Sequence, residues 1–358
     1  MIDTENMDLN QMLELVVARA ASDLHLIAGV PPMIRIDGEL APIPGENPLT
    51  PERVQTLLKS VLSAEQSEQL IVNKELDFSL SFSDRARFRV NAYTQKQSLA
   101  GAFRAIPLEI PAIDALGLPP ILHSFTSMRQ GLVLVTGPTG HGKSTTLASM
   151  LDEINTNFSE HIITIEDPIE FVIRPKRSII SQREMNNDTH SWAVALRSVL
   201  REDPDVVLVG EMRDYETIAA ALTVAETGHL VFATLHTNSA SQTIDRVVDV
   251  FPSEQQDQIR LQFSNVLEAV VSQRLIPAIS GGRLVAHELM LATTAIRTAI
   301  REGKTHQIDS IIQTSSEVGM NTLESSLATL VRDGKITMET AKSFAIRPEQ
   351  LGRMVHRE

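Results

Sequence analysis

The chain has 358 residues, with 32 Lys plus Arg against 45 Asp plus Glu, so its formal net charge is −13. It contains no cysteine, which excludes disulfide scaffolds, Cys-ligated zinc, iron–sulfur clusters and thiol nucleophiles. The acidic balance argues against non-specific nucleic-acid binding, because such binding needs a basic surface. No signal-peptide pattern is present, and no apolar run approaches the roughly 20 residues of a membrane span. We therefore expect a soluble, cytoplasmic protein of two or three domains.

Residues 1–110 predict a small α/β domain. An apolar stripe indicates a helix over residues 10–21, and Thr50 as a cap indicates a second helix over residues 51–62. Asp37–Gly38 is a hairpin-turn signal. Alternating or apolar stretches indicate strands at residues 24–26, 33–36, 77–82, 87–92 and 101–106.

The chain changes character after residue 110. A proline-rich stretch predicts a linker at residues 111–120. Residues 121–290 alternate apolar strands with helices, which is typical of a parallel sheet. Residues 291–358 are helical by pattern. We therefore predict an α/β protein with a linker and a C-terminal helical region.

One segment fits the phosphate-binding pattern G-x-x-x-x-G-K-[ST] after a buried strand and before a helix. In such a loop, successive backbone N–H groups converge on phosphate oxygens. Lys143 is expected to reach the β- and γ-phosphates, and the Ser144 hydroxyl to bind Mg²⁺. We expect the His141 side chain to face solvent. The predicted nucleotide-binding residues are Gly137, Pro138, Thr139, Gly140, His141, Gly142, Lys143, Ser144 and Thr145.

Acidic residues follow two other predicted strands, and the carboxyl ends of parallel strands meet at one edge of a sheet. Glu211 follows the strand at residues 206–209, so its carboxylate is expected to serve Mg²⁺. Glu166, Asp167 and Glu170 follow another strand and are candidates to activate the attacking water.

Basic residues suggest two further contributions to this site. His229 and His236 flank one strand and are candidate sensors of the γ-phosphate, although a lone histidine at a strand end is more often structural. Phosphoryl transfer also gains from a cation supplied by another subunit. Arg87, Arg89 and Arg104 are candidates for that cation, and solvated strand arginines are the simpler interpretation.

Four motifs occur together in this chain: the P-loop at residues 137–145, TIEDPIEF at 164–171, GEMRD at 210–214 and TGHLVFATLH at 227–236. With them, the sequence resembles the secretion-superfamily ATPases, and within them the retraction ATPases of type IV pili. The resemblance implies a PAS-like N-terminal domain, a RecA-like P-loop ATPase domain with C-terminal helices, and a homohexameric ring that uses ATP and Mg²⁺.

The resemblance also assigns roles by position. Glu170 matches the catalytic glutamate, Glu211 the atypical Walker B residue, and His229 and His236 the histidine box. Lys143 matches the P-loop lysine. Arginines of the N-terminal domain in this family reach the nucleotide of a neighbouring subunit, and the segments that hold Arg87, Arg89 and Arg104 match theirs.

Two features favour retraction over pilus assembly. Assembly ATPases carry a tetracysteine motif, which is absent here. Retraction ATPases carry AIRNLIRE, and residues 295–302 read AIRTAIRE, with Arg297 and Arg301 retained and Thr298 and Ala299 departing. The implied partners are an inner-membrane platform protein and, through it, the pilin fibre, with the motor attached peripherally to that machine.

Three alternatives remain open. The altered motif at residues 295–302 is compatible with an accessory retraction ATPase that depends on a paralogous motor. A RecA-like nucleic-acid motor is opposed by the charge of −13 and by the lack of a basic–aromatic groove. A nucleotide-binding scaffold without activity is opposed by Glu170 and Glu211.

Overall fold

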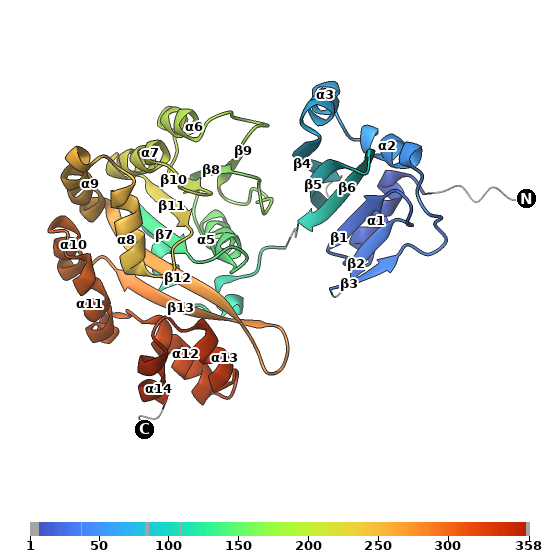
Figure 1. Ribbon diagram of the computed structural model, residues 1–358. Coiled ribbons are helices and arrows are strands. Elements are labelled where there is room, and N and C mark those ends of the chain that lie inside the picture. Colours follow the sequence, from blue (N-terminus) through green and yellow to red (C-terminus); the bar gives the residue numbers. More distant parts are fainter. Residues whose placement is uncertain (1–6, 37, 83–85, 107–108, 356–358) are drawn as a thin grey trace, which may run out of the picture. The chain divides into compact units, whose positions relative to one another are not determined.

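The computed structural model describes residues 7–36, 38–82, 86–106 and 109–355 (Figure 1). The chain divides into two compact units. The first comprises Met1–Glu109 with Glu170–Val172, and the second comprises Ile110–Ile169 with Ile173–Glu358. No helix among the described residues is long and apolar enough to cross a membrane.

The first unit is a six-stranded antiparallel sheet with three helices, and its strand order is β3-β2-β1-β6-β5-β4. Its elements are α1 (Leu9–Ala18), β1 (Asp23–Ile27), β2 (Met33–Ile36), β3 (Glu39–Pro42), α2 (Pro51–Lys59), α3 (Ala64–Asn73), β4 (Glu75–Phe82), β5 (Ala86–Gln95) and β6 (Ser98–Ile106).

The side chains of this sheet separate into an apolar and a polar face. Leu24, Phe88 and Phe103 are fully buried and share a core with residues of the three helices. The residues next to these along each strand, such as Asp23 and Arg104, lie on the opposite face because side chains alternate along a strand. The polar face is therefore not covered by the unit's own helices.

The second unit is built on a seven-stranded sheet of order β13-β12-β7-β11-β10-β8-β9, in which only β13 is antiparallel to its neighbour. Its strands are β7 (Gly131–Thr136), β8 (His161–Glu166), β9 (Ile179–Glu184), β10 (Val206–Val209), β11 (Leu230–Leu235), β12 (Leu267–Pro277) and β13 (Arg283–Leu291).

Helices cover both faces of this sheet (Figure 1). The helices of the second unit are η1 (Ile113–Leu116), α4 (Leu122–Thr126), α5 (Lys143–Asn157), α6 (Trp192–Val199), α7 (Tyr215–Glu226), α8 (Ala240–Asp249), α9 (Ser253–Val266), α10 (Thr294–Arg301), η2 (Thr305–Gln307), α11 (Ile308–Thr314), η3 (Ser316–Val318), α12 (Leu323–Arg332), α13 (Met338–Phe344) and α14 (Pro348–Val355). The last three, α12 to α14, share a separate core with residues of β12 and β13. Val133 and Val135 share a core with α4 and α5, whereas Leu132 and Leu134 share one with α6 to α11. Burial on both faces explains why the central strands β7 and β10 are almost uninterrupted apolar runs.

The α/β class predicted from the sequence is confirmed. Thr50 caps α2 as expected, since its hydroxyl accepts a hydrogen bond from the backbone N–H of Arg53 at 3.2 Å. Helix α3 and the antiparallel β12–β13 hairpin were not predicted. Asp37 of the expected Asp37–Gly38 turn lies outside the described residues, and the PAS likeness of the first unit stays a prediction.

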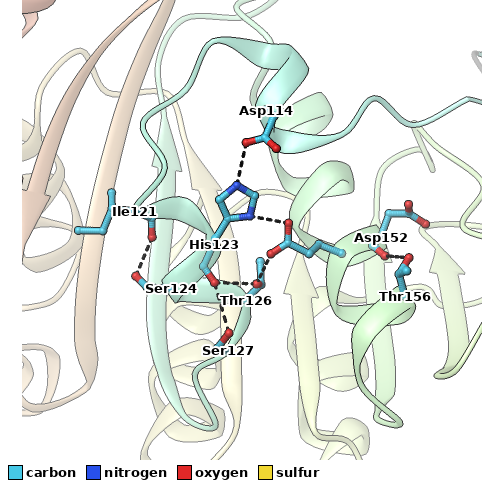
Figure 2. A network of polar contacts seen from close by, with 9 residues as sticks. Asp114, Ile121, His123, Ser124, Thr126, Ser127, Asp152 and Thr156 are labelled. Atoms are coloured by element: carbon cyan, nitrogen blue, oxygen red, sulfur yellow. Dashed lines mark hydrogen bonds and ion pairs between the residues drawn. The ribbon is translucent and has the colours of Figure 1, made fainter.

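The P-loop helix α5 is anchored near its C-terminal end by a charged network (Figure 2). The His123 ring lies between two carboxylates, with Nε2 3.0 Å from Asp114 and Nδ1 2.7 Å from Glu153 of α5. The hydroxyl of Thr126 donates to the other oxygen of Glu153 at 2.6 Å. Hydrogen bonds to Asp114 and then Glu153 raise the pKa of His123. This network ties η1 and α4 to α5.

A second charged cluster joins the sheet to the C-terminal helices. Glu288 of β13 is 3% exposed, and its carboxylate accepts a hydrogen bond from the backbone N–H of Ala240, the first residue of α8, at 2.7 Å. Glu324 of α12 accepts from the backbone N–H of Arg347 at 2.8 Å, and Arg347 forms an ion pair with Asp309. Burial raises the pKa of Glu288 to about 7.

The buried Glu288 makes stability depend on pH. Its pKa is about 7 in the folded chain against 4.5 in the unfolded chain, so the folded state binds more protons between these values. The free energy of unfolding should therefore fall as pH rises through this window, by about 3 kcal/mol. In urea unfolding, Glu288→Gln should match the parent near pH 5 and exceed its midpoint near pH 8.

Glu339→Gln is the matched control, because Glu339 is exposed at the start of α13. It should follow the parent at both pH values. Parallel curves for the parent and Glu288→Gln would contradict the assignment.

Candidate functional site

The P-loop connects β7 to α5 at the carboxyl edge of the sheet. Gly137, Gly140 and Gly142 have φ values of +138°, +78° and +85°, in which other residues are strained. Helix α5 begins directly after Gly142 and has no side-chain cap. The first backbone N–H groups of such a helix have no intrahelical partner, so they can bind phosphate oxygens.

Gly137 and Gly142 are also required by the packing of the loop on β12. A Cβ atom on Gly137 would lie 2.3 Å from the carbonyl oxygen of Gln273, and one on Gly142 would lie 3.1 Å from its side-chain nitrogen. The first distance is shorter than any real contact. The loop is therefore held close to β12.

Gln273, on β12, holds both halves of the loop. It is 2% exposed, and its side-chain Nε2 donates to the carbonyl oxygen of His141 at 2.9 Å. Its Oε1 accepts from the hydroxyl of Thr146, in the first turn of α5, at 2.9 Å. Sequence reasoning missed Gln273, because no local motif marks a residue that acts from a strand more than a hundred positions away.

The prediction of a solvent-facing His141 is wrong. Its Nδ1 accepts a hydrogen bond from the backbone N–H of Leu275 at 2.9 Å, so the ring is docked on β12. Burial, followed by the charges of Arg274 and Lys143, lowers the pKa of His141. A neutral ring is what an accepting Nδ1 requires. His141 thus helps to fix the loop on the sheet.

Lys143 is folded back into the loop and is 8% exposed. Its ammonium donates to the carbonyl oxygens of Gly137 at 2.9 Å and Pro138 at 3.1 Å. It also lies 3.4 Å from Nδ1 of His236. Lys143, the predicted phosphate-binding lysine, therefore lies inside the curve of the P-loop and beside His236, which follows β11.

Glu211 and His236 meet at the same edge, as the parallel strand order predicts. His236 Nε2 lies 3.2 Å from Glu211, while its Nδ1 faces Lys143 and, at 3.3 Å, the hydroxyl of Thr139. Because Lys143 can only donate, Nδ1 accepts and Nε2–H donates to Glu211. One imidazole ring therefore links the carboxylate after β10 to the P-loop.

Arg213 neutralises Glu211 through a two-pronged ion pair. Its Nε and one terminal nitrogen each lie 2.8 Å from a different oxygen of the carboxylate. Burial alone would raise the pKa of Glu211, but the hydrogen bond from Arg213 and the neighbouring His236 lower it overall. Glu211 is thus held as a carboxylate, the form that a divalent cation needs.

His229 does not share this site within one chain. It precedes β11, and its backbone oxygen accepts from the N–H of Gly131, at the amino end of β7. Its ring Nδ1 lies 3.1 Å from the carbonyl oxygen of Val224. Six residues of extended strand, about 20 Å, separate it from His236. The expectation that both histidines sense one phosphate therefore fails within a subunit.

The acidic residues after β8 are in different environments. Glu166 is 7% exposed, and its Oε1 accepts from the hydroxyl of Thr164 at 2.7 Å and from Gln182 at 3.2 Å. Through its bond to Gln182, the Glu166 carboxylate connects β8 to β9. Glu170 is exposed and belongs to the segment grouped with the first unit. Its catalytic role stays a prediction.

The predicted arginines have distinct settings. Arg87 and Arg89 lie on β5 and Arg104 on β6, in the polar face of the first sheet. Arg297 of α10 donates to the carbonyl oxygen of Ser264 at 2.6 Å and to Glu268 at 2.9 Å, so it caps the end of α9.

Arg301 is exposed, and it donates only to Thr298 of its own helix, at 3.1 Å, among the described residues. Of the two arginines in the retraction motif, Arg301 is therefore the one available to a partner.

Comparisons with known proteins place the chain among secretion and pilus ATPases. A family model described as "Type II/IV secretion system protein" matches residues 5–281. The chain is 50% identical over 343 residues to the type IV pilus retraction ATPase PilT of Pseudomonas aeruginosa, covering 96% of this chain and 99% of that protein. It is 38% identical over 350 residues to the type IV pilus ATPase PilU of the same organism, covering 98% of this chain and 91% of that protein.

The solved structures agree. A crystal structure of the pilus retraction motor PilT with bound ADP matches with a TM-score of 0.92 and 47% identity, covering 97% of this chain and 100% of that one. The likeness therefore extends over both compact units and is not confined to the P-loop.

Replacing Gln273 should weaken nucleotide binding. In Gln273→Leu the carbonyl oxygen of His141 and the hydroxyl of Thr146 lose their buried partner, at a cost of about 1–3 kcal/mol. We expect the affinity for a fluorescent ADP analogue to fall by about tenfold or more, with the circular dichroism spectrum unchanged.

Gln262→Leu is the matched control, since Gln262 makes a surface hydrogen bond to Glu226 on α7. It should bind the analogue like the parent. An unchanged affinity in Gln273→Leu would show that β12 does not support the loop.

Proposed function

The chain belongs to the type II/IV secretion system protein family, and from this premise we propose that it is the ATP-hydrolysing motor that drives retraction of type IV pili. One observation carries the proposal: the P-loop, Glu211 and His236 meet at one sheet edge in a chain that resembles retraction ATPases over almost its full length. The motor would convert nucleotide-dependent changes of its ring into removal of pilin from the fibre.

The residues of the site suit ATP hydrolysis. The loop N–H groups and Lys143 bind the phosphates, and the oxygen donors Ser144 and Glu211 have the chemistry that Mg²⁺ prefers. The described residues contain no cluster of three or more His, Asp or Glu that could hold a metal alone. This fits an ion that arrives with the phosphates, whose charge it would neutralise. Glu170 would orient and deprotonate the attacking water.

We further propose that the active assembly is a homohexamer at the cytoplasmic face of the inner membrane. In this ring, His229 and the N-terminal arginines of one subunit would serve the interface with the next. The platform protein of the pilus machine would receive the motion and transmit it to the pilin fibre. Exposed Arg301 is a candidate contact for that platform.

An accessory role is the second candidate, and the departure at Thr298 and Ala299 favours it. The Ala299 side chain is buried in α10, and Thr298 accepts a hydrogen bond from Arg301. Deleting the gene and scoring twitching motility, with and without the paralogous motor, separates the roles. If the protein is a primary motor, its deletion should abolish twitching whether or not the paralogous motor is present. If it is an accessory ATPase, its deletion should change twitching only in cells that contain the paralogous motor.

Two substitutions should separate binding from turnover. Lys143→Ala should abolish nucleotide binding or hydrolysis, because the cation beside the phosphates is lost. Glu170→Gln should bind ATP like the parent but lower kcat by at least about 100-fold, because an amide cannot accept the water's proton. Phosphate release and ATP-analogue binding measure the two effects.

Glu349→Gln, at an exposed position in the first turn of α14, is the control for Glu170→Gln and should hydrolyse ATP normally. Normal turnover in Glu170→Gln would contradict the role assigned to Glu170. Stimulation by polynucleotide, with no effect of pilus components, would contradict the pilus function.

A further inference from the structure

A row of charged side chains crosses the polar face of the first sheet. In the strand register, Asp23 of β1 lies directly opposite Arg35 of β2 and Arg104 of β6. Arg104 in turn lies opposite Arg89 of β5. Residues in register on neighbouring strands share one face, so a single acidic residue stands among three arginines.

Asp23 binds the Nε atom of Arg104 rather than its terminal nitrogens. Arg104 Nε donates to Asp23 Oδ1 at 2.9 Å, and among the described residues Arg104 makes no other hydrogen bond or ion pair. The Asp23 side chain is 9% exposed, whereas that of Arg104 is 72% exposed. The buried carboxylate therefore fixes the inner edge of the guanidinium and leaves its two terminal nitrogens outward, in the fork geometry that binds oxyanions.

The other contacts of Asp23 make it a rigid support. The hydroxyl of Ser22 donates to Oδ2 at 2.8 Å, and Arg35 lies 3.9 Å from the same oxygen. Arg35 is itself fixed by a hydrogen bond to the carbonyl oxygen of Gly38 at 2.7 Å. Although burial raises the pKa of Asp23, the bonds from Ser22 and Arg104 lower it overall. Asp23 thus stays charged.

This row of arginines is expected to lower the stability of the sheet unless the positive charge meets an anion. Like charges directly opposite each other on antiparallel strands are destabilising, and Arg89 and Arg104 form such a pair. Asp23 offsets part of the repulsion, but only on the side of Arg104. A row that concentrates positive charge outward, in a chain of net charge −13, suits an anion brought to it from outside.

We propose that Asp23 is a positioning residue that aims Arg104 at the phosphates of a neighbouring subunit's nucleotide. This inference rests on the proposed function and deepens it, since it selects Arg104 from three candidate arginines and names its support. Arg87 is half-buried, and Arg89 lies one strand further from the carboxylate. Without Asp23, repulsion from Arg35 and Arg89 turns Arg104 away from its productive direction.

The first experiment is a double-mutant cycle on the full-length ring. Arg104→Ala should lower kcat by about 1000-fold or more. Asp23→Ala should lower it by about 100-fold through misplacement of the guanidinium, with the KM for ATP nearly unchanged. The double variant should be no slower than Arg104→Ala, because Asp23 acts only through Arg104.

Two variants guard against a merely structural effect. Asp23→Asn keeps the shape of the side chain and should reproduce the loss in kcat with an unchanged thermal midpoint and ring mass. Asp77→Ala is the matched control, since Asp77 lies on the same face and contacts Asn91 rather than an arginine. It should retain the parent kcat.

The second experiment tests action between subunits. Asp23→Ala subunits have an intact P-loop, and Lys143→Ala subunits have an intact arginine row. Mixed rings should hydrolyse ATP faster than the sum of the two pure rings, because some intact P-loops then face a correctly held Arg104.

The outcomes are distinct. Absence of a gain on mixing, additive losses in the double variant, or an equal loss in Asp77→Ala would each overturn the inference. If the parent hydrolyses ATP and Asp23→Asn has the same kcat, the inference is overturned but the proposed function is not. A parent without ATPase activity would overturn both.

Discussion

The close approach of the P-loop to β12 is the constraint on which the nucleotide site depends. The backbone of Gly137 lies against the carbonyl oxygen of Gln273, at a distance that leaves no room for a Cβ atom. Gln273 and Leu275 then hold His141 and Thr146, so the loop has its shape before any phosphate arrives. A preformed loop loses less conformational entropy when it binds, which leaves more binding energy for distinguishing nucleotide states. The same β12–β13 hairpin carries Glu288 and packs against the C-terminal helices, so one element supports both the loop and the end of the chain.

Parallel strand order accounts for which polar residues meet. Strands β7, β11 and β10 are neighbours in register, so the residues that follow them reach a common edge. His236 consequently contacts both Lys143 and Glu211, so a single ring connects the P-loop to the carboxylate that follows β10. His229 lies at the other end of the same strand, where its ring contacts Val224 and Thr227 at the C-terminal end of α7. Two histidines of one motif are thus separated by the length of a strand, and of the two it is His236 that lies beside the P-loop.

The sequence was sufficient for features that are local or periodic. The apolar strands, the cap at Thr50 and the loop from Gly137 to Ser144 are encoded by neighbours in the chain, and the structure has them where predicted. The sequence was insufficient where a side chain acts on a distant segment. No residue near Gln273 in the sequence indicates its role. His141 was predicted to face solvent because the N–H that donates to its ring belongs to Leu275 of β12, far away in the sequence. The antiparallel β12–β13 hairpin was also missed, because polar residues such as Gln273 and Glu288 interrupt the apolar pattern of its two strands.

The arginines of the first sheet illustrate a different limit. From sequence, Arg87, Arg89 and Arg104 are equivalent, because each is a basic residue at an alternate strand position. Register distinguishes them, since only Arg104 lies directly opposite the buried Asp23. A carboxylate that binds Nε reduces the freedom of a long side chain without using the nitrogens that would meet an oxyanion, so it lowers the entropy lost in a later contact. A solvated surface arginine needs no such support. The conflict between neighbouring like charges and the cost of burying Asp23 therefore argue that this row is retained for the contact it presents, rather than for the stability of the sheet.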